Sequence, residues 1–157
     1  MAELDHDAIK NAIATILKAD ATLYDVTGAN DKVRQVNVGH PDNSKGLDEV
    51  FPSIYITNSN PLERIKLQGT TVGATLPCLE HTFRYKIIIQ EQTKGSRTTE
   101  KSLDDRQKLV LEALEADFQL NNNVDMSRPE MVETFRNDLN GKPVQGRIIT
   151  YVLRKLT

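Results

Sequence analysis

Three histidines and one cysteine are the residues best suited to metal binding or nucleophilic chemistry in this 157-residue chain. His6, His40 and His81 are far apart, and none has a second ligand at the short spacing typical of zinc sites. His6 lies between two aspartates at the start of a predicted helix, where capping explains the carboxylates. Cys78 has no adjacent histidine or lysine to activate it, so we expect an inert thiol. The sequence therefore predicts no metal site and no cofactor.

Three further segments outline a known motif, and each lacks a required part. Residues 42–53 resemble a calcium loop, but Leu47 and Ser53 stand where glycine and glutamate are needed. Residues 69–73 have the outline of a nucleophile elbow with threonine in place of serine, but no helix is expected to follow. The Gly-Lys pair at Gly141 lacks the upstream glycine and the following hydroxyl residue of a phosphate loop. No catalytic residue is predicted, and we expect a protein that is not an enzyme.

A small basic cluster is the remaining candidate. Lys94, Arg97 and Lys101 lie in residues 93–101, a segment without any apolar side chain. We expect a mobile polar loop there, because nothing in it can be buried. The basic residues are diluted by Glu100 and its acidic neighbours, which favours an ordinary solvated surface. The functional interpretation is a loop that lies near DNA or near a charged partner ring.

Apolar spacing predicts two amphipathic helices that position these segments. In residues 5–23, Ile9, Ile13 and Leu17 repeat at helical intervals and form one stripe. The second helix is predicted over residues 102–120, with Ser102 as its N-cap. The predicted strands are residues 33–38, 53–57, 81–92, 131–139 and 144–156, and Asn-Gly at positions 140–141 indicates a hairpin between the last two. The pattern favours an α+β class, a mostly antiparallel sheet with two helices packed on it.

Residues 58–80 are too apolar for a free loop and too interrupted by proline and glycine for one element. The apolar side chains include Leu62, Ile65, Leu67 and Val72. We expect a hairpin arm, with residues 63–68 paired to residues 71–76. Such an arm would bury its apolar side chains on its own domain or on a neighbour, so these four residues are candidate interface residues.

The last predicted strand is apolar on both faces. Ile149 and Tyr151 lie on one face, and Ile148 and Val152 lie on the other. A strand of this kind is usually covered on both sides. The helices would cover one face, and a neighbouring subunit would fit the other, which makes Ile148 and Val152 candidate interface residues.

Length and charge limit the classes of function. A chain of 157 residues suits a single domain, residues 1–157, that buries a core without disulfides. A formal net charge of −2 argues against a dedicated nucleic-acid-binding protein. Neither a signal peptide nor a membrane span is recognisable, so we expect no membrane partner and a cytoplasmic site of synthesis.

The order of these elements resembles that of tail-terminator, or tail-completion, proteins of long-tailed bacteriophages. The likeness covers most of the chain and lies in pattern and size. It rests on the N-terminal amphipathic helix, the strand introduced by Pro52-Ser53-Ile54-Tyr55-Ile56, the long strand at residues 83–90, the helix at 104–118 and the closing strand GRIITYVL at 146–153.

The resemblance implies an α+β protein that assembles into a ring, commonly a hexamer. The ring would cap the finished tail tube, stop its polymerisation and present a surface to the head connector. The implied partners are further copies of the chain, the tail tube protein and the head connector or neck protein. DNA would pass through the lumen without sequence-specific binding. The implied location is the virion tail or neck, assembled in the host cytoplasm.

Two other functions are compatible with the same residues. The first is a neighbouring virion role, as a head–tail connector, neck protein or minor tail protein. The second is a cellular peptide-binding domain or assembly factor. Binding to purified tail tubes, rather than to portal or connector rings, would distinguish the terminator from the first alternative, and a strictly monomeric state would favour the second.

Overall fold

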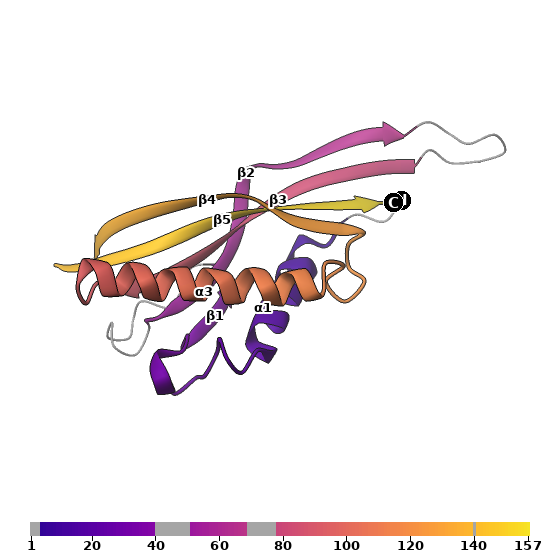
Figure 1. Ribbon diagram of the computed structural model, residues 1–157. Coiled ribbons are helices and arrows are strands. Elements are labelled where there is room, and N and C mark those ends of the chain that lie inside the picture. The colour runs from indigo at the N-terminus through magenta and orange to yellow at the C-terminus, as the bar shows by residue number, and fades with distance from the viewer. Residues whose placement is uncertain (1–3, 40–50, 69–77, 140) are drawn as a thin grey trace.

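The computed structural model describes residues 4–39, 51–68, 78–139 and 141–157 (Figure 1). The elements in chain order are α1 (His6–Ala19), η1 (Ala29–Asp31), β1 (Gln35–Val38), β2 (Ser53–Gln68), β3 (Cys78–Gln92), α3 (Ser96–Ala116), β4 (Met126–Leu139) and β5 (Lys142–Leu156). The described residues form a five-stranded, mostly antiparallel sheet with two longer helices. This confirms the predicted α+β class.

The strand order across the sheet is β1-β2-β3-β5-β4. The short strand β1 pairs parallel to β2, and every other pairing is antiparallel. The strands β3 and β5 form the centre, where Ile88 lies between Tyr55 of β2 and Ile148 of β5. The long strand β4 is therefore one edge of the sheet, and the other edge is shared by β1 and the part of β2 that extends beyond it.

The helix α1 begins as the sequence predicts. The Asp5 side chain caps it by accepting a hydrogen bond from the backbone N–H of Ala8 at 3.0 Å. Its predicted apolar stripe is buried, with Ile9, Ile13 and Leu17 in the core. The helix ends at Ala19, four residues before the predicted end, because the chain becomes extended at Asp20.

Both helices lie on the same face of the sheet (Figure 1), where α3 contacts β3, β5 and β4 and α1 contacts β1 and β2. The core between helices and sheet is built from alternating strand residues, since successive side chains of a strand point to opposite faces. Its fully buried apolar strand members are Val36, Ile54, Ile56, Phe83, Tyr85, Ile87, Ile89, Ile149, Tyr151 and Leu153. The alternation read from the sequence is confirmed in β3 and β5.

The prediction of a mobile polar loop at residues 93–101 is wrong. The helix α3 starts at Ser96, so most of this segment forms its first turns. Thr99 is only 2% exposed, and its hydroxyl accepts a hydrogen bond from the backbone N–H of Lys94 at 3.0 Å. The prediction failed because it judged burial by apolar residues alone. A threonine that satisfies loop backbone is buried as well, and the charged residues around it are good helix formers.

The predicted hairpin between the last two strands is confirmed. Leu139 pairs with Lys142, and Gly141 has a φ of 79°, as a tight hairpin turn requires. The strand β4 begins at Met126, five residues earlier than predicted, because it continues through Pro129 with a shift of register. Proline is tolerated there because β4 is an edge strand.

Candidate interaction surfaces

The arm is the extension of β2 and β3 beyond the helices (Figure 1), and the end of β5 pairs with β3 along its base. After a register shift between Asn58 and Glu63, residues 63–68 pair antiparallel with residues 78–83. The sequence placed the return strand at residues 71–76. That position is wrong because the alternation of β3 continues back from His81 to Cys78, and residues 71–76 lie outside the described part. The arm itself, as an extended hairpin, is present.

The four predicted arm residues have different environments. Leu62 is partly buried and packs against the core of its own chain. Ile65 is 60% exposed, although it lies on the helix side of the sheet, opposite His81. The backbone of Leu67 pairs with Leu79, and its side chain lies outside the described atoms, as does Val72 entirely. Of the predicted arm residues whose side chains the structure describes, Ile65 therefore has the most apolar surface to offer a partner.

The base of the arm holds a network that sequence reasoning missed. The Glu63 carboxylate lies between two imidazoles, with Oε1 2.6 Å from Nδ1 of His81 and Oε2 3.2 Å from Nε2 of His6. The second nitrogen of each ring also has a partner. Nδ1 of His6 is 2.7 Å from the Tyr85 hydroxyl, and Nε2 of His81 is 3.0 Å from Oγ1 of Thr157. His6 and His81 thus contact the same carboxylate, although they lie 57 and 18 positions from Glu63 in the sequence.

All four contacts can be satisfied with both imidazoles neutral. In that arrangement each histidine donates one N–H to Glu63, and the hydroxyls of Tyr85 and Thr157 donate to the remaining ring nitrogens. The network joins the first turn of α1, the arm and the chain end. Each imidazole nitrogen already has a protein partner, which suits a structural role. We call this network of His6, Glu63, His81, Tyr85 and Thr157 the clasp.

The charge state of Glu63 follows from its partners. Burial raises the pKa of its carboxyl group, but the hydrogen bonds from His81 and His6 outweigh burial, and the net pKa is lowered. The pKa of the Tyr85 hydroxyl is raised by burial and by the nearby carboxylates of Glu63 and Asp5. Glu63 is therefore a carboxylate and Tyr85 a neutral donor at neutral pH.

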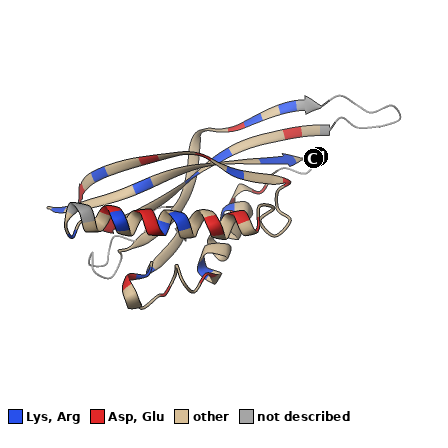
Figure 2. Cartoon of the chain, viewed as in Figure 1, with Lys and Arg blue, Asp and Glu red and all other residues tan. Residues whose placement is uncertain are grey.

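The three predicted basic residues do not form one loop. Lys94 precedes α3 and is exposed, Lys101 is exposed in the second turn of α3, and the side chain of Arg97 lies outside the described atoms. Acidic and basic residues alternate along α3 (Figure 2). One acidic neighbour, Glu100, lies 3.9 Å from Arg136 of β4. This mixed surface favours the solvated interpretation of the cluster over a basic patch.

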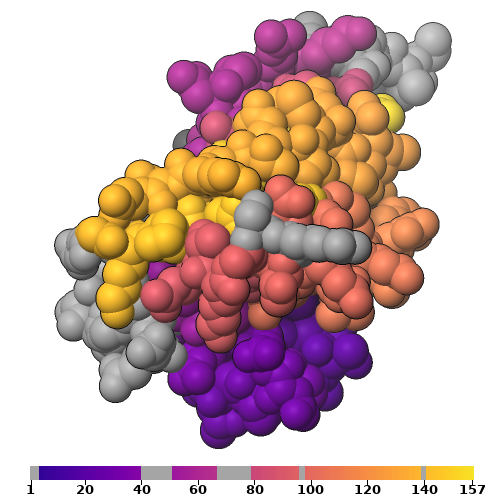
Figure 3. Space-filling model, turned by 60° about the vertical axis from the view of Figure 1, so that its left-hand side comes forward, coloured from indigo at the N-terminus to yellow at the C-terminus, as the bar shows by residue number. Residues whose placement is uncertain are grey.

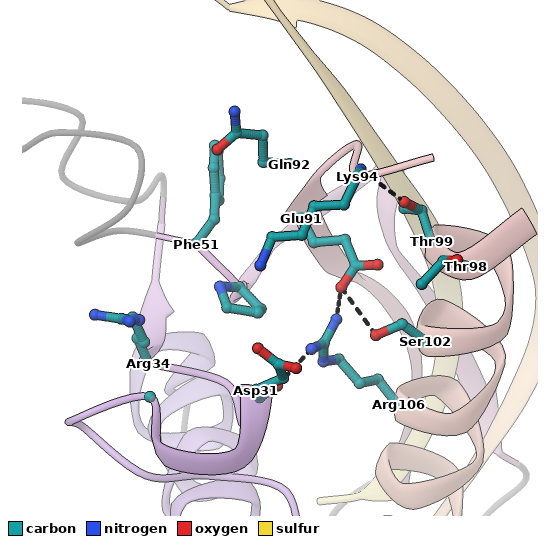
Figure 4. Close-up of a pocket in the computed structure, with 12 residues that line it drawn as sticks. Asp31, Arg34, Phe51, Glu91, Gln92, Lys94, Thr98, Thr99, Ser102 and Arg106 are labelled. Atoms are coloured by element: carbon teal, nitrogen blue, oxygen red, sulfur yellow. Dashed lines mark hydrogen bonds and ion pairs between the residues drawn. The ribbon is translucent and has the colours of Figure 1, made fainter. Parts of the chain in front are cut away.

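A hollow of about 300 Å³ lies between the start of α3 and the η1 turn (Figure 4). At its floor Arg106 forms an ion pair with Glu91 and donates to the backbone carbonyl of Asp31. Ser102 donates to the same Glu91 carboxylate at 3.1 Å. These contacts connect α3 to the end of β3 and to η1. The hollow is therefore the space where α3, β3 and η1 pack against one another.

The hollow offers little chemistry. Its buried acid and its buried base neutralise each other, and its hydroxyl residues Thr98, Thr99 and Ser102 have no histidine beside them among the lining residues. Burial lowers the pKa of Arg106 to about 10, partly offset by the charge of Asp31, so the guanidinium stays protonated at neutral pH. The ion pair is therefore permanent and structural.

The predicted face of Ile148 and Val152 lies opposite the helices. Val152 is 7% exposed and Ile148 is partly exposed, within this chain alone. Ile88 and Thr150 on the same face are also buried. Because Val152 has little surface left, it is a packing residue of this chain first, and Ile148 has more surface to give to a neighbour.

The most exposed strand is the edge strand β4, which runs over the surface beside α3 (Figure 3). Met131 and Val132 are 49% and 38% exposed, although they point to opposite faces of the sheet. Exposed charges surround them, and Arg84 of β3 binds Glu130 through Nε at 2.9 Å. The sequence predicted the strand, but nothing in its alternation distinguished an edge from a centre.

No protein-family model matches the chain, and no curated protein sequence matches it significantly. Among the described residues, no three His, Cys, Asp or Glu side chains are arranged to hold a metal ion. None of the helices in the described part of the chain is long and apolar enough to cross a membrane. The interaction surfaces must therefore be interpreted from their own geometry.

Proposed function

We propose that the chain is a structural virion protein that assembles into a ring, caps the tail tube of a long-tailed phage and joins it to the head connector. The observation that carries this proposal is the arm. It extends beyond the helices, and its apolar residue Ile65 is 60% exposed. The apolar surface of Ile65 is suited to contact with a neighbour.

The anchoring of the arm supports an assembly role. Glu63, His6 and His81 fix its base, and Leu79 and Thr157 exchange two backbone hydrogen bonds at 3.1 and 2.9 Å. A fixed base reduces the conformational entropy that an arm loses when it docks. Repeated contacts between one surface and a different surface of the next copy close into a ring when the rotation between copies permits it.

The proposed partners follow from the family that the chain resembles. They are further copies of the chain, commonly six in a ring, the tail tube protein, and the connector or neck protein. DNA passes through the lumen without sequence-specific contacts, which agrees with the net charge of −2 and the mixed charges on α3. Catalysis has no part in this function, since recognition between surfaces performs it.

A second candidate is a protein that binds an extended peptide. The long, exposed edge strand β4 favours it, because such edges accept an added strand from a partner. A neighbouring role as connector, neck or minor tail protein uses the same surfaces as the terminator. The identity of the bound ring or tube separates these virion roles.

The test uses tail tubes from the phage that encodes the protein and two matched variants. Ile65→Asp places a charge on the arm, whereas Val26→Asp places one at a 69% exposed apolar residue of the α1–η1 connection. Both variants should fold with unchanged circular dichroism. We expect Ile65→Asp to lose binding to tube ends and Val26→Asp to retain it. Equal binding by both variants would remove the arm from the proposal.

A further inference from the structure

The sheet has two long edges without a strand partner in the described part of the chain. One is β4, the last strand in the order. The other is the outer side of β2 beyond Ile56, because β1 pairs only with residues 53–56. Each edge presents backbone N–H and C=O groups that can pair with another chain. The row on β2 is interrupted at Pro61, which lacks an N–H, and by the register shift between Asn58 and Glu63, so its regular part begins at Glu63.

The direction of the strands determines how two copies can join these edges. The strand β2 is antiparallel to β3, β3 to β5, and β5 to β4. Consequently β2 and β4 run in opposite directions within one copy. When neighbouring copies keep the same orientation, as in a ring with small rotations, β4 of one copy meets β2 of the next as an antiparallel pair. The sheet then continues across the boundary without a break in pattern.

The side chains on the two edges are complementary in one register. Arg64 on the arm and Glu133 on β4 both lie on the sheet face opposite the helices, and neither forms an ion pair with another described residue. When these two stand opposite each other, Ile65 stands opposite Val132 on the helix side. Both apolar residues are exposed in the single chain, at 60% and 38%. One register therefore pairs opposite charges on one face and apolar surface on the other.

Part of β4 is unsuited to this pairing, which limits the contact. Pro129 lacks an N–H, and the register shifts between Pro129 and Met131. Proline and bulges are common protections of sheet edges. The segment after them, residues 131–139, pairs with β5 in unbroken register, and no other strand of the described part of the chain pairs with its outer edge.

We propose that the arm strand β2 of one copy adds antiparallel to β4 of the next copy, with Ile65 opposite Val132 and Arg64 opposite Glu133. This inference rests on the proposed ring and names the contact that builds it. The occupant of the β4 edge is thus a second copy of this chain rather than a foreign peptide. Each copy gives one arm and receives another, so the contact is head-to-tail, as a closed ring requires.

Disulfide trapping tests the register directly. Cys78 is the only native cysteine, so a Cys78→Ser background leaves no competing thiol. In that background we compare Ile65→Cys with Val132→Cys against a matched control, Ile65→Cys with Glu133→Cys, in which the second thiol points to the other face. Opposed residues of an antiparallel pair have Cα atoms about 4.5–5.5 Å apart, within the range that a disulfide spans. We expect a ladder of cross-linked copies for the first pair, at least tenfold more than for the control.

Charge reversal gives an independent measurement. Arg64→Glu or Glu133→Arg alone should weaken association about tenfold in sedimentation, and the double variant should return to within about threefold of the wild type. Assembled rings that give equal cross-linking in both cysteine pairs, or no recovery in the double variant, would overturn this contact and leave the ring intact. A protein that stays monomeric at every concentration and with tail tubes present would instead overturn the ring itself, and the contact with it.

Discussion

Replacing Glu63 by glutamine tests the clasp at the base of the arm. The carboxylate accepts hydrogen bonds from His81 at 2.6 Å and from His6 at 3.2 Å. Glutamine keeps one acceptor and places an NH₂ group where the other oxygen stood. A histidine facing that NH₂ must change tautomer. If His6 changes, its Nδ1–H points at the Tyr85 hydroxyl. The hydrogen of that hydroxyl then loses its acceptor, His6 Nδ1, in a fully buried site.

The magnitude follows from these groups. A hydrogen bond to a charged group contributes about 1.5–3 kcal/mol, and a buried donor left unsatisfied costs about 1–3 kcal/mol. Because Glu63 is partly exposed to solvent, we expect the lower part of this range, about 2 kcal/mol. For a domain of this length, each kcal/mol changes the melting temperature by about 2–4 °C, so Glu63→Gln should melt about 4–8 °C lower.

The effect should depend on pH in a defined direction. The pKa of Glu63 is lowered in the folded protein from its ordinary value of 4.5. The carboxylate therefore contributes stability that is fully present above pH 4.5 and is lost as the pH falls through the folded pKa. The difference in free energy of unfolding between wild type and Glu63→Gln should be largest near neutral pH and should shrink below pH 4.

Chemical denaturation at pH 7 and at pH 3.5 provides the assay, with hydrogen exchange of the arm amides as a local measurement. The matched control is Glu115→Gln, an exposed residue of α3 outside the arm and both sheet edges, whose change should stay within about 0.5 kcal/mol. We expect faster exchange at residues 63–68 and 78–83 in Glu63→Gln and not in the control. Unchanged stability together with unchanged arm exchange would refute the clasp.

Three further changes test the packing. Arg106→Ala leaves Glu91 buried without its ion pair and should cost about 3–5 kcal/mol in denaturation; a loss below 1 kcal/mol would contradict the buried pair. Deleting residues 96–100, harmless if they formed a loop, should lower the melting temperature because the first turns of α3 and Thr99 are lost; an unchanged melting temperature would restore the loop. Gly146→Ala places a Cβ inside van der Waals contact with the carbonyl oxygen of Ile89 and with the Phe135 ring and should cost about 1–3 kcal/mol in denaturation; an unchanged stability would contradict this close packing.

The elements with strong periodicity were predictable from sequence. The stripe of α1, its Asp5 cap, the alternation of β3 and the final hairpin all follow from local rules, and the structure confirms them. The start of α3 was not predictable in this way. Its first turns contain no apolar residue, and they are fixed by a threonine that bonds to the preceding loop. The spacing of apolar residues does not predict the burial of a polar side chain such as that of Thr99.

The candidate surfaces also include features that the sequence predicted and features that depend on the folded arrangement. The existence of an arm at residues 58–80 followed from apolar residues that no free loop would expose. The clasp at its base did not, because His6, Glu63 and His81 come from three separate segments and meet only through strand register and helix placement. Likewise, an edge strand and a central strand can show the same alternation of apolar and polar residues in the sequence. Only the strand order in the folded protein identifies β4 as an edge. The same order places Val152 on a central strand, where its own chain covers most of its side chain.

Electron microscopy of the purified protein mixed with phage tail tubes tests the proposed function most directly. The proposal predicts rings of the protein alone or on tubes, density at one end of each tube, and tubes that no longer lengthen when free tube protein is added. Particles that remain monomeric, leave both tube ends bare and allow continued growth would contradict it.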